Sequence, residues 1–153
     1  MSLDVYEKIQ TPATTEAQTV DEVITLDHLT REKGRFKTQT VSGQEVRVFL
    51  ERGSVLDAGH LLKSSCARVI RVEYAPEAVT RATAPDWPSF ARACYHLGNR
   101  HVRLQMGDLW LQMMPDHVLE DMLLSFGLRV EHRDAAFIPE RGAYSAQAHH
   151  HDH

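Results

Sequence analysis

The chain has 153 residues, of which 42% are hydrophobic, and it carries a formal net charge of -4 at pH 7. This length suits one ordinary domain or two small ones, and the negative charge argues against a general nucleic-acid binder, which is usually basic. No apolar run approaches the roughly 18 residues that a membrane span requires. Two cysteines do not make a disulfide framework, so we expect a soluble protein of the cytoplasm.

The first half of the chain, residues 1–75, is predicted to be a small all-β domain. Residues 1–20 have weak periodicity and should join the sheet late, as an irregular or edge segment. The runs 34–41 and 45–50 alternate around a Ser42-Gly43 turn, which predicts a β-hairpin. Turn signals recur with no helical pattern between them. Further strands are expected at 23–26 and 68–74.

The composition changes at residues 75–78, where the second predicted domain, residues 76–138, begins. Its first helix follows a strand; Asp86 can cap it, and Gly98 should end it in a left-handed conformation. The order strand, helix, strand, strand, helix, strand predicts a ferredoxin-like domain with both helices on one face of an antiparallel sheet. The fold class is therefore α+β. The expected strands are 79–83, 101–106, 109–113 and 128–132, with helices between Asp86 and Gly98 and between Pro115 and Gly127.

Strand alternation makes the other face of this sheet a candidate contact surface. It turns His101, Arg103 and Gln105 away from the helices. The neighbouring strand contributes an outward Trp110 and Gln112, and an exposed tryptophan beside charged residues is typical of a protein interface. Residues 139–153 have no periodicity and should form a flexible tail that carries histidines.

The ten histidines are the compositional oddity of the chain, and four of them fall in the last five positions. One imidazole is an incomplete site, because a first-row metal wants about four ligands. A two-fold dimer would pair two copies of one histidine, and tail imidazoles would add ligands suited to nickel, copper or zinc. The candidate metal ligands are His101, His117, His149, His150, His151 and His153.

Plainer interpretations stand beside these candidates. His101 fits a solvated residue at the start of a strand, and His117 fits an exposed residue of a first helical turn. The C-terminal run fits a purification tag, although Asp152 interrupts it. Cys94 lies on a helical apolar stripe and is expected in the core, and His96 is expected to be structural. His28, His60 and His132 are isolated and are assigned no role.

Catalytic motifs are absent from the sequence. It contains no His-Glu-x-x-His, Gly-x-Ser-x-Gly, Walker or dinucleotide-binding motif. A metal-dependent hydrolase would need an acid or base beside the metal, and none is evident near His101. We therefore predict a protein that is not an enzyme.

Residues 93–101, Ala-Cys-Tyr-His-Leu-Gly-Asn-Arg-His, closely resemble the signature of the UreE family of urease accessory proteins, which are nickel metallochaperones. The resemblance extends over nearly the whole chain. It continues at 116–123, 126–128, 137–144 and the tail, and in the first half at 50–53, 56 and 59–62.

The resemblance implies an N-terminal domain that binds peptide and a C-terminal domain that dimerises. It also implies that His101 binds nickel at the homodimer interface with help from the tail, and that nickel is delivered to the urease apoprotein complex with a GTPase accessory protein. The short tail argues against large storage capacity. Pro115 stands where some members have a second histidine, so His117 would act alone. The alternative is a protein-interaction adaptor in which metal binding is incidental.

Overall fold

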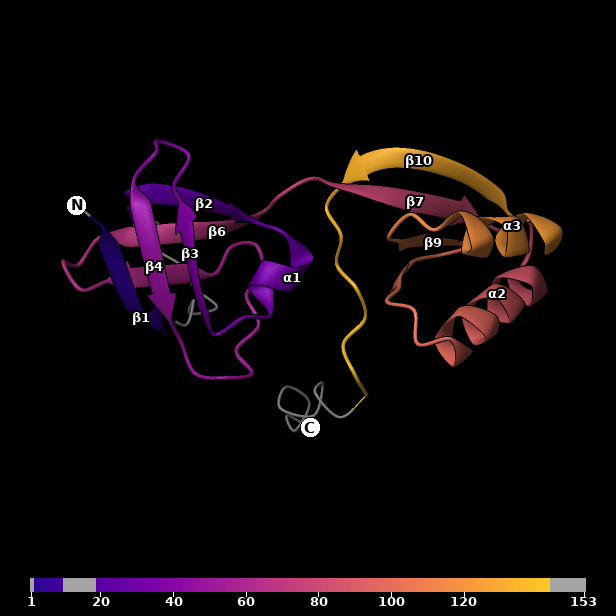
Figure 1. Cartoon of the computed structure of the whole chain (residues 1–153), viewed down its shortest axis with the longest axis horizontal. Helices are drawn as coiled ribbons and strands as arrows, with labels where there is room; N and C mark the ends of the chain where they lie inside the picture. The colour runs from indigo at the N-terminus through magenta and orange to yellow at the C-terminus, as the bar shows by residue number, and fades with distance from the viewer. Residues whose placement is uncertain (1, 10–18, 144–153) are drawn as a thin grey trace. The chain divides into compact units, whose positions relative to one another are not determined.

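A computed structural model describes residues 2–9 and 19–143 (Figure 1). The chain divides into two compact units, Met1–Ala75 and Pro76–His153. Within the described residues, no helix is long and apolar enough to cross a membrane.

The first unit is a six-stranded sheet with one short helix, in the strand order β2-β6-β5-β1-β4-β3. Buried aliphatic side chains from five of these strands form its core. The expected hairpin is present, because β3 and β4 pair antiparallel with Arg35 opposite Phe49. The elements are β1 (Leu3–Ile9), β2 (Glu22–Leu26), α1 (His28–Arg31), β3 (Arg35–Gln39), β4 (Glu45–Phe49), β5 (Leu61–Ser64) and β6 (Val69–Tyr74).

Two expectations for this unit were wrong. Strand β1 is not an edge segment: it lies between β5 and β4, antiparallel to the first and parallel to the second. The reason is that Leu3 and Val5 alternate and are buried in the core, a short signal that the polar residues after them obscured. The unit is also not purely β, because it contains the single-turn helix α1. Asp27 caps this helix by accepting the Thr30 amide hydrogen over 2.8 Å.

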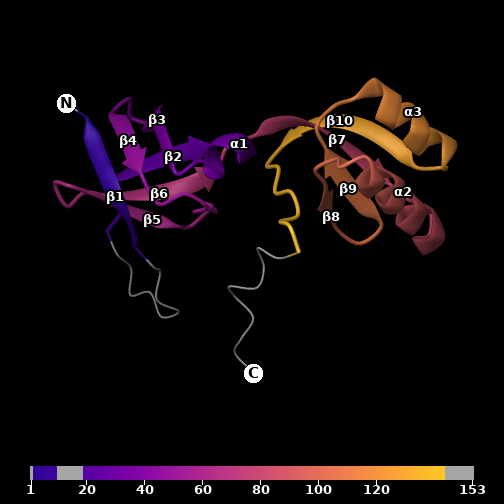
Figure 2. The ribbon, with the colours of Figure 1, turned by 60° about the horizontal axis from the view of Figure 1, so that its bottom comes forward.

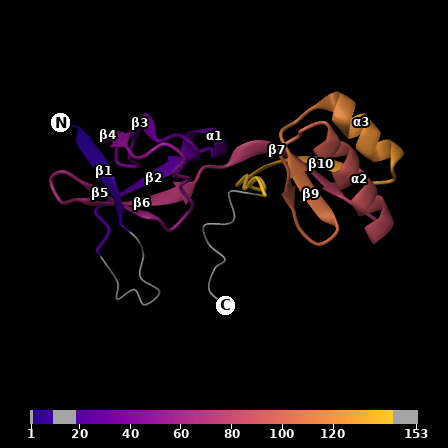
Figure 3. The same cartoon turned by 90° about the horizontal axis from the view of Figure 1, so that it is seen from below.

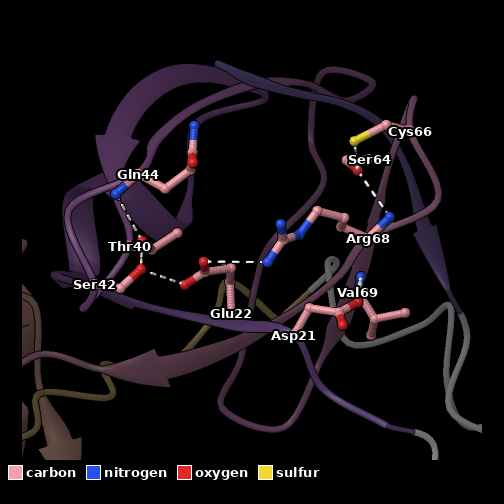
Figure 4. Close-up of polar contacts among 9 residues, drawn as sticks. All are labelled: Asp21, Glu22, Thr40, Ser42, Gln44, Ser64, Cys66, Arg68 and Val69. Carbon is pink, nitrogen blue, oxygen red and sulfur yellow. Dashed lines mark hydrogen bonds and ion pairs between the residues drawn. The ribbon is translucent and has the colours of Figure 1, made fainter. Parts of the chain in front are cut away.

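Polar contacts tie β2 to two turns of the first unit (Figure 4). The carboxylate of Glu22 accepts a hydrogen bond from Ser42 Oγ over 2.8 Å and pairs with Arg68 over 3.4 Å. The Val41 amide also donates to the carbonyl of Val23 over 2.9 Å. The chain that follows β3 therefore reaches β2, although these strands stand at opposite ends of the strand order.

The second unit is a four-stranded antiparallel sheet in the order β10-β7-β9-β8. The predicted order of strands and helices is observed. Ala93 and Leu97 of one helix, Leu123 of the other and Leu111 and Met113 of the sheet share one buried cluster, so both helices cover the same face (Figure 3). The elements are β7 (Glu77–Thr83), α2 (Trp87–Asn99), β8 (Gln105–Met106), β9 (Trp110–Met113), α3 (His117–Ser125) and β10 (Arg129–Ala135).

Candidate metal-binding surface around His101

Helix α2 presents His101 at its C-terminal end. It starts as predicted: Asp86 accepts the Ser89 amide hydrogen over 2.8 Å, and Pro88 lies in the first turn. It does not end as predicted. Gly98 stays inside the helix, which continues to Asn99, and the left-handed residue is His101, with φ at 57°.

Two backbone hydrogen bonds explain why the left-handed residue is His101. The Val102 amide donates to the Leu97 carbonyl over 3.1 Å, and the His101 amide donates to the Gly98 carbonyl over 3.0 Å. This pair of bonds is the Schellman motif, which places its left-handed residue directly before the residue that donates the longer-range bond. Val102 packs against the buried cluster that contains Leu97, the hydrophobic contact that usually accompanies the motif.

A histidine at this position carries a conformational cost. Left-handed backbone costs a residue with a Cβ about 1–2 kcal/mol, although histidine is one of the residue types found there more often. Glycine is the usual occupant. The His101 side chain is exposed and makes no hydrogen bond, ion pair or ring contact with the rest of the described chain. Strained backbone is often found at functional sites, and an exposed, unengaged histidine in this conformation is therefore a candidate functional residue.

The expectation that His101 begins a strand was therefore wrong. Strand β8 starts only at Gln105, and residues 102–104 connect it to α2. The orientation of His101 is set by the helix end instead of by strand alternation.

The surroundings of His101 are positively charged. Arg100 and Arg103 are exposed on either side of it, and Arg100 Nη1 donates to the His96 carbonyl over 3.4 Å. No group of three or more His, Cys, Asp or Glu side chains that could hold a metal occurs within residues 2–9 and 19–143. The described residues of one chain therefore do not form a site of three or more such ligands around His101.

The other predicted ligands lie apart from a complete site. His117 is the exposed first residue of α3, next to Asp116, whose carboxylate accepts the Val118 and Leu119 amide hydrogens over 3.0 and 3.1 Å. The structure does not gather His117 into a cluster of ligand-type side chains. The four predicted tail ligands lie outside the described residues; they are His149, His150, His151 and His153.

Nearby side chains that resemble ligands have structural contacts. Cys94 packs against the core of the second unit, and burial raises the pKa of its thiol, which disfavours the thiolate that metals bind. The His96 ring lies 5.2 Å from the Phe126 ring, measured between centroids. These contacts agree with the core and structural roles expected for the two residues.

The sequence did not reveal a polar cluster beneath α3. Glu120 accepts hydrogen bonds from Thr80 on β7 and from His132 Nε2 on β10, the latter over 2.6 Å. Burial tends to raise the pKa of Glu120, but the bonds from Thr80 and His132 outweigh it and hold the pKa below its usual value. The cluster joins α3 to two strands, and residues so distant in the chain leave no local pattern.

The sheet face away from the helices is less open than predicted. Gln112 is only 2% exposed, and its Nε2 donates to Gln105 Oε1 over 2.9 Å and to the Ala136 carbonyl over 3.3 Å. The Arg81 guanidinium lies over the half-buried Trp110 ring, 4.0 Å from its centroid. The expectation of an exposed Gln112 was wrong, because residues after β10 return across this face.

Comparisons with known proteins agree with this architecture. Residues 5–75 match the family model described as UreE urease accessory protein, N-terminal domain, and residues 77–153 match the corresponding C-terminal domain model. The urease accessory protein UreE of Marinomonas sp. (strain MWYL1) is 48% identical over 149 residues, covering 97% of this chain and 99% of that protein. The protein of the same name from Psychromonas ingrahamii is 44% identical over 154 residues, covering 99% and 97%.

Proposed function

Because this chain belongs to the UreE family of urease accessory proteins, we propose that it is a nickel metallochaperone. In this proposal it binds nickel at a homodimer interface and delivers it to the urease apoprotein complex together with a GTPase accessory protein. Members of the family are accessory proteins and not enzymes, and their place in urease maturation implies metal handling.

The observation that carries the proposal is the imidazole of His101. It is exposed, unengaged and held in a left-handed conformation that glycine adopts at lower cost. One such imidazole cannot hold nickel, but two copies related by a two-fold axis supply half of a four-ligand site. In the proposal, His149, His150, His151 and His153 provide the remaining ligands, and His117 is an auxiliary ligand.

Nickel is proposed as the cargo on the basis of ligand chemistry and family. Neutral imidazoles bind nickel, copper and zinc, and copper binds such sites more tightly, so zinc and copper are expected to bind in vitro. We place the protein in the cytoplasm, a proposal that two free cysteines, Cys66 and Cys94, support because thiols stay reduced there. No nucleic-acid or membrane partner is proposed.

We also assign the second unit to the ferredoxin-like fold as its dimerisation domain. The support is the sheet order β10-β7-β9-β8, in which the first and third strands are central, and the shared helix face. The residues after this domain are proposed to form the histidine-bearing tail.

Isothermal titration calorimetry of nickel at neutral pH tests the proposal, with oligomeric state measured in parallel. We expect about one tightly bound nickel ion per dimer in the wild type, since the described residues of one chain gather no group of three ligand-type side chains. His101→Asn should abolish this site, because it removes the imidazole ligand. Asparagine tolerates left-handed backbone, so the substitution should preserve the fold. His132→Gln is the matched control: it removes an exposed imidazole that pairs with Glu120, and it should leave binding intact.

Two outcomes would contradict the proposal. Unchanged nickel affinity and stoichiometry in His101→Asn would remove its central residue. A chain that dimerises and binds its partners equally well with and without chelator would favour the adaptor alternative. Binding should also weaken below about pH 6, because an imidazole must lose its proton to ligate a metal.

A further inference from the structure

Residues 136–140, here called the strap, follow β10 and lie against the β8 edge of the second sheet (Figure 2). The strap is bound at every second residue. The hydrogen bonds are Gln112 Nε2 to the Ala136 carbonyl (3.3 Å), the Ile138 amide to Gln105 Oε1 (3.0 Å) and the Glu140 amide to the Leu104 carbonyl (2.6 Å). The chain that was expected to become a flexible tail at residue 139 is therefore still bound at residue 140.

Gln105 joins the centre of the strap to the sheet, beside the contact that Gln112 makes with Ala136. Its Oε1 accepts two hydrogen bonds, from the Ile138 amide over 3.0 Å and from Gln112 Nε2 over 2.9 Å. Gln105 and Gln112 are opposite each other in the β8–β9 register, and Gln112 is almost fully buried. Loss of Gln105 would leave the Ile138 amide without its acceptor.

Phe137 gives the strap an apolar anchor between its polar contacts. Its side chain has no exposed surface, while the residues on either side of it make the hydrogen bonds to Gln112 and Gln105. Full burial of a phenylalanine is worth about 1.5–3 kcal/mol, so the strap is a packed part of the unit.

The strap leads the chain toward His101. Glu140 is bound to Leu104, whose Cα lies within about 11 Å of the His101 Cα because the two residues are only three positions apart in the chain. His149 follows nine residues after Glu140, and a chain of that length reaches at most about 32 Å. If the strap were fully released from Ala135 onward, His149 would lie fourteen positions after the last bound residue instead of nine. The effective concentration of the tail at His101 would then fall by about twofold, since it varies as roughly the -3/2 power of the chain length.

We infer that Gln105 is a positioning residue that holds the strap, so that the C-terminal histidines start from beside His101. The inference rests on the proposed function, in which His101 and the tail histidines hold nickel. It adds that the tail contributes to affinity because the strap shortens its reach, and that Gln105 on β8 is one of the residues that hold the strap in place.

The test uses the full chain and four altered forms of it. Gln105→Leu removes the acceptor, and Gln105→Glu keeps it. Ile138→Pro removes the donor without altering the sheet, which guards against misfolding of the Gln105→Leu protein. The fourth form ends after Ala148. Hydrogen exchange of the Ala136, Phe137 and Glu140 amides, which every form retains, is measured without metal. Nickel affinity is measured by calorimetry, with each substitution also made in the truncated chain.

We expect Gln105→Leu and Ile138→Pro to speed exchange in the strap by about fivefold, the effect of one net hydrogen bond. Both should weaken nickel binding in the full chain by up to about twofold, the loss that full release of the strap would cause, and leave the truncated chain unchanged. Gln105→Glu, which keeps the acceptor, should leave strap exchange and nickel affinity at their wild-type values.

Unchanged strap exchange in Gln105→Leu and Ile138→Pro overturns the inference. Equal weakening of nickel binding in full and truncated chains also overturns it, because the effect would not then pass through the tail. Neither result affects the proposed function, which is tested separately by nickel binding of His101→Asn and by partner binding with and without chelator.

Discussion

The cost in stability of the left-handed conformation of residue 101, where φ is 57°, can be measured by comparing glycine with alanine at this position. Both substitutions remove the imidazole, so the difference between them isolates the backbone. Alanine keeps the clash of about 1–2 kcal/mol that a Cβ causes there. Glycine avoids it but loses about 0.5–1 kcal/mol more in chain entropy. We therefore expect His101→Gly to be more stable than His101→Ala by somewhat under about 1 kcal/mol.

Tryptophan fluorescence measures this difference directly. The only two tryptophans of the chain, Trp87 and Trp110, both belong to the second unit, so their emission follows the unfolding of that unit. For a unit of this size, 1 kcal/mol corresponds to about 4–8 °C, and the expected advantage of glycine is about 3–6 °C in Tm. The melts are made with chelator present, so that lost metal binding does not contribute. Nickel titration should show no tight site in either protein.

Asn99 supplies the matched control, because it is the last helical residue of α2. In a helix the order reverses, and Asn99→Ala should be more stable than Asn99→Gly by up to about 1 kcal/mol. The reasoning is refuted if glycine at position 101 is no more stable than alanine. Such a result would mean that the left-handed residue is not what ends α2.

Two further predictions concern the sheet and helix that support this region. The pKa of Glu120 lies below its usual 4.5, so its contribution to stability is present above that pH and is lost as the pH falls through the lowered pKa. Urea titrations from pH 6 down to about pH 3 should show that the free energy of unfolding falls more steeply with pH in the wild type than in Glu120→Gln. Parallel plots of this free energy against pH would contradict the prediction. Gly107→Ala should destabilise the second unit by about 1–3 kcal/mol, because a Cβ there would lie 2.2 Å from the Trp110 ring. A wild-type Tm and emission spectrum in Gly107→Ala would refute that contact.

Local patterns predicted much of the fold. Asp86 and Pro88 mark the start of α2 because a cap acts on amides two or three residues away. The alternating runs around Ser42-Gly43 predict the β3–β4 hairpin for the same reason, since the turn sets the register. The central place of β1 was missed, because which strands flank it depends on pairings with residues about 40 to 60 positions away.

The features of the candidate site also fall into those that local sequence determined and those that depend on tertiary structure. The sequence by itself determined that His101 follows α2 and that it is a candidate ligand, since the helical stripe and the motif of residues 93–101 are local. Only the tertiary structure decided that His101, and not Gly98, is the left-handed residue, because Val102 packs on the core and draws the motif to that register. The strap likewise depends on contacts between distant parts of the chain, and no local pattern reports the hydrogen bond from Ile138 to Gln105.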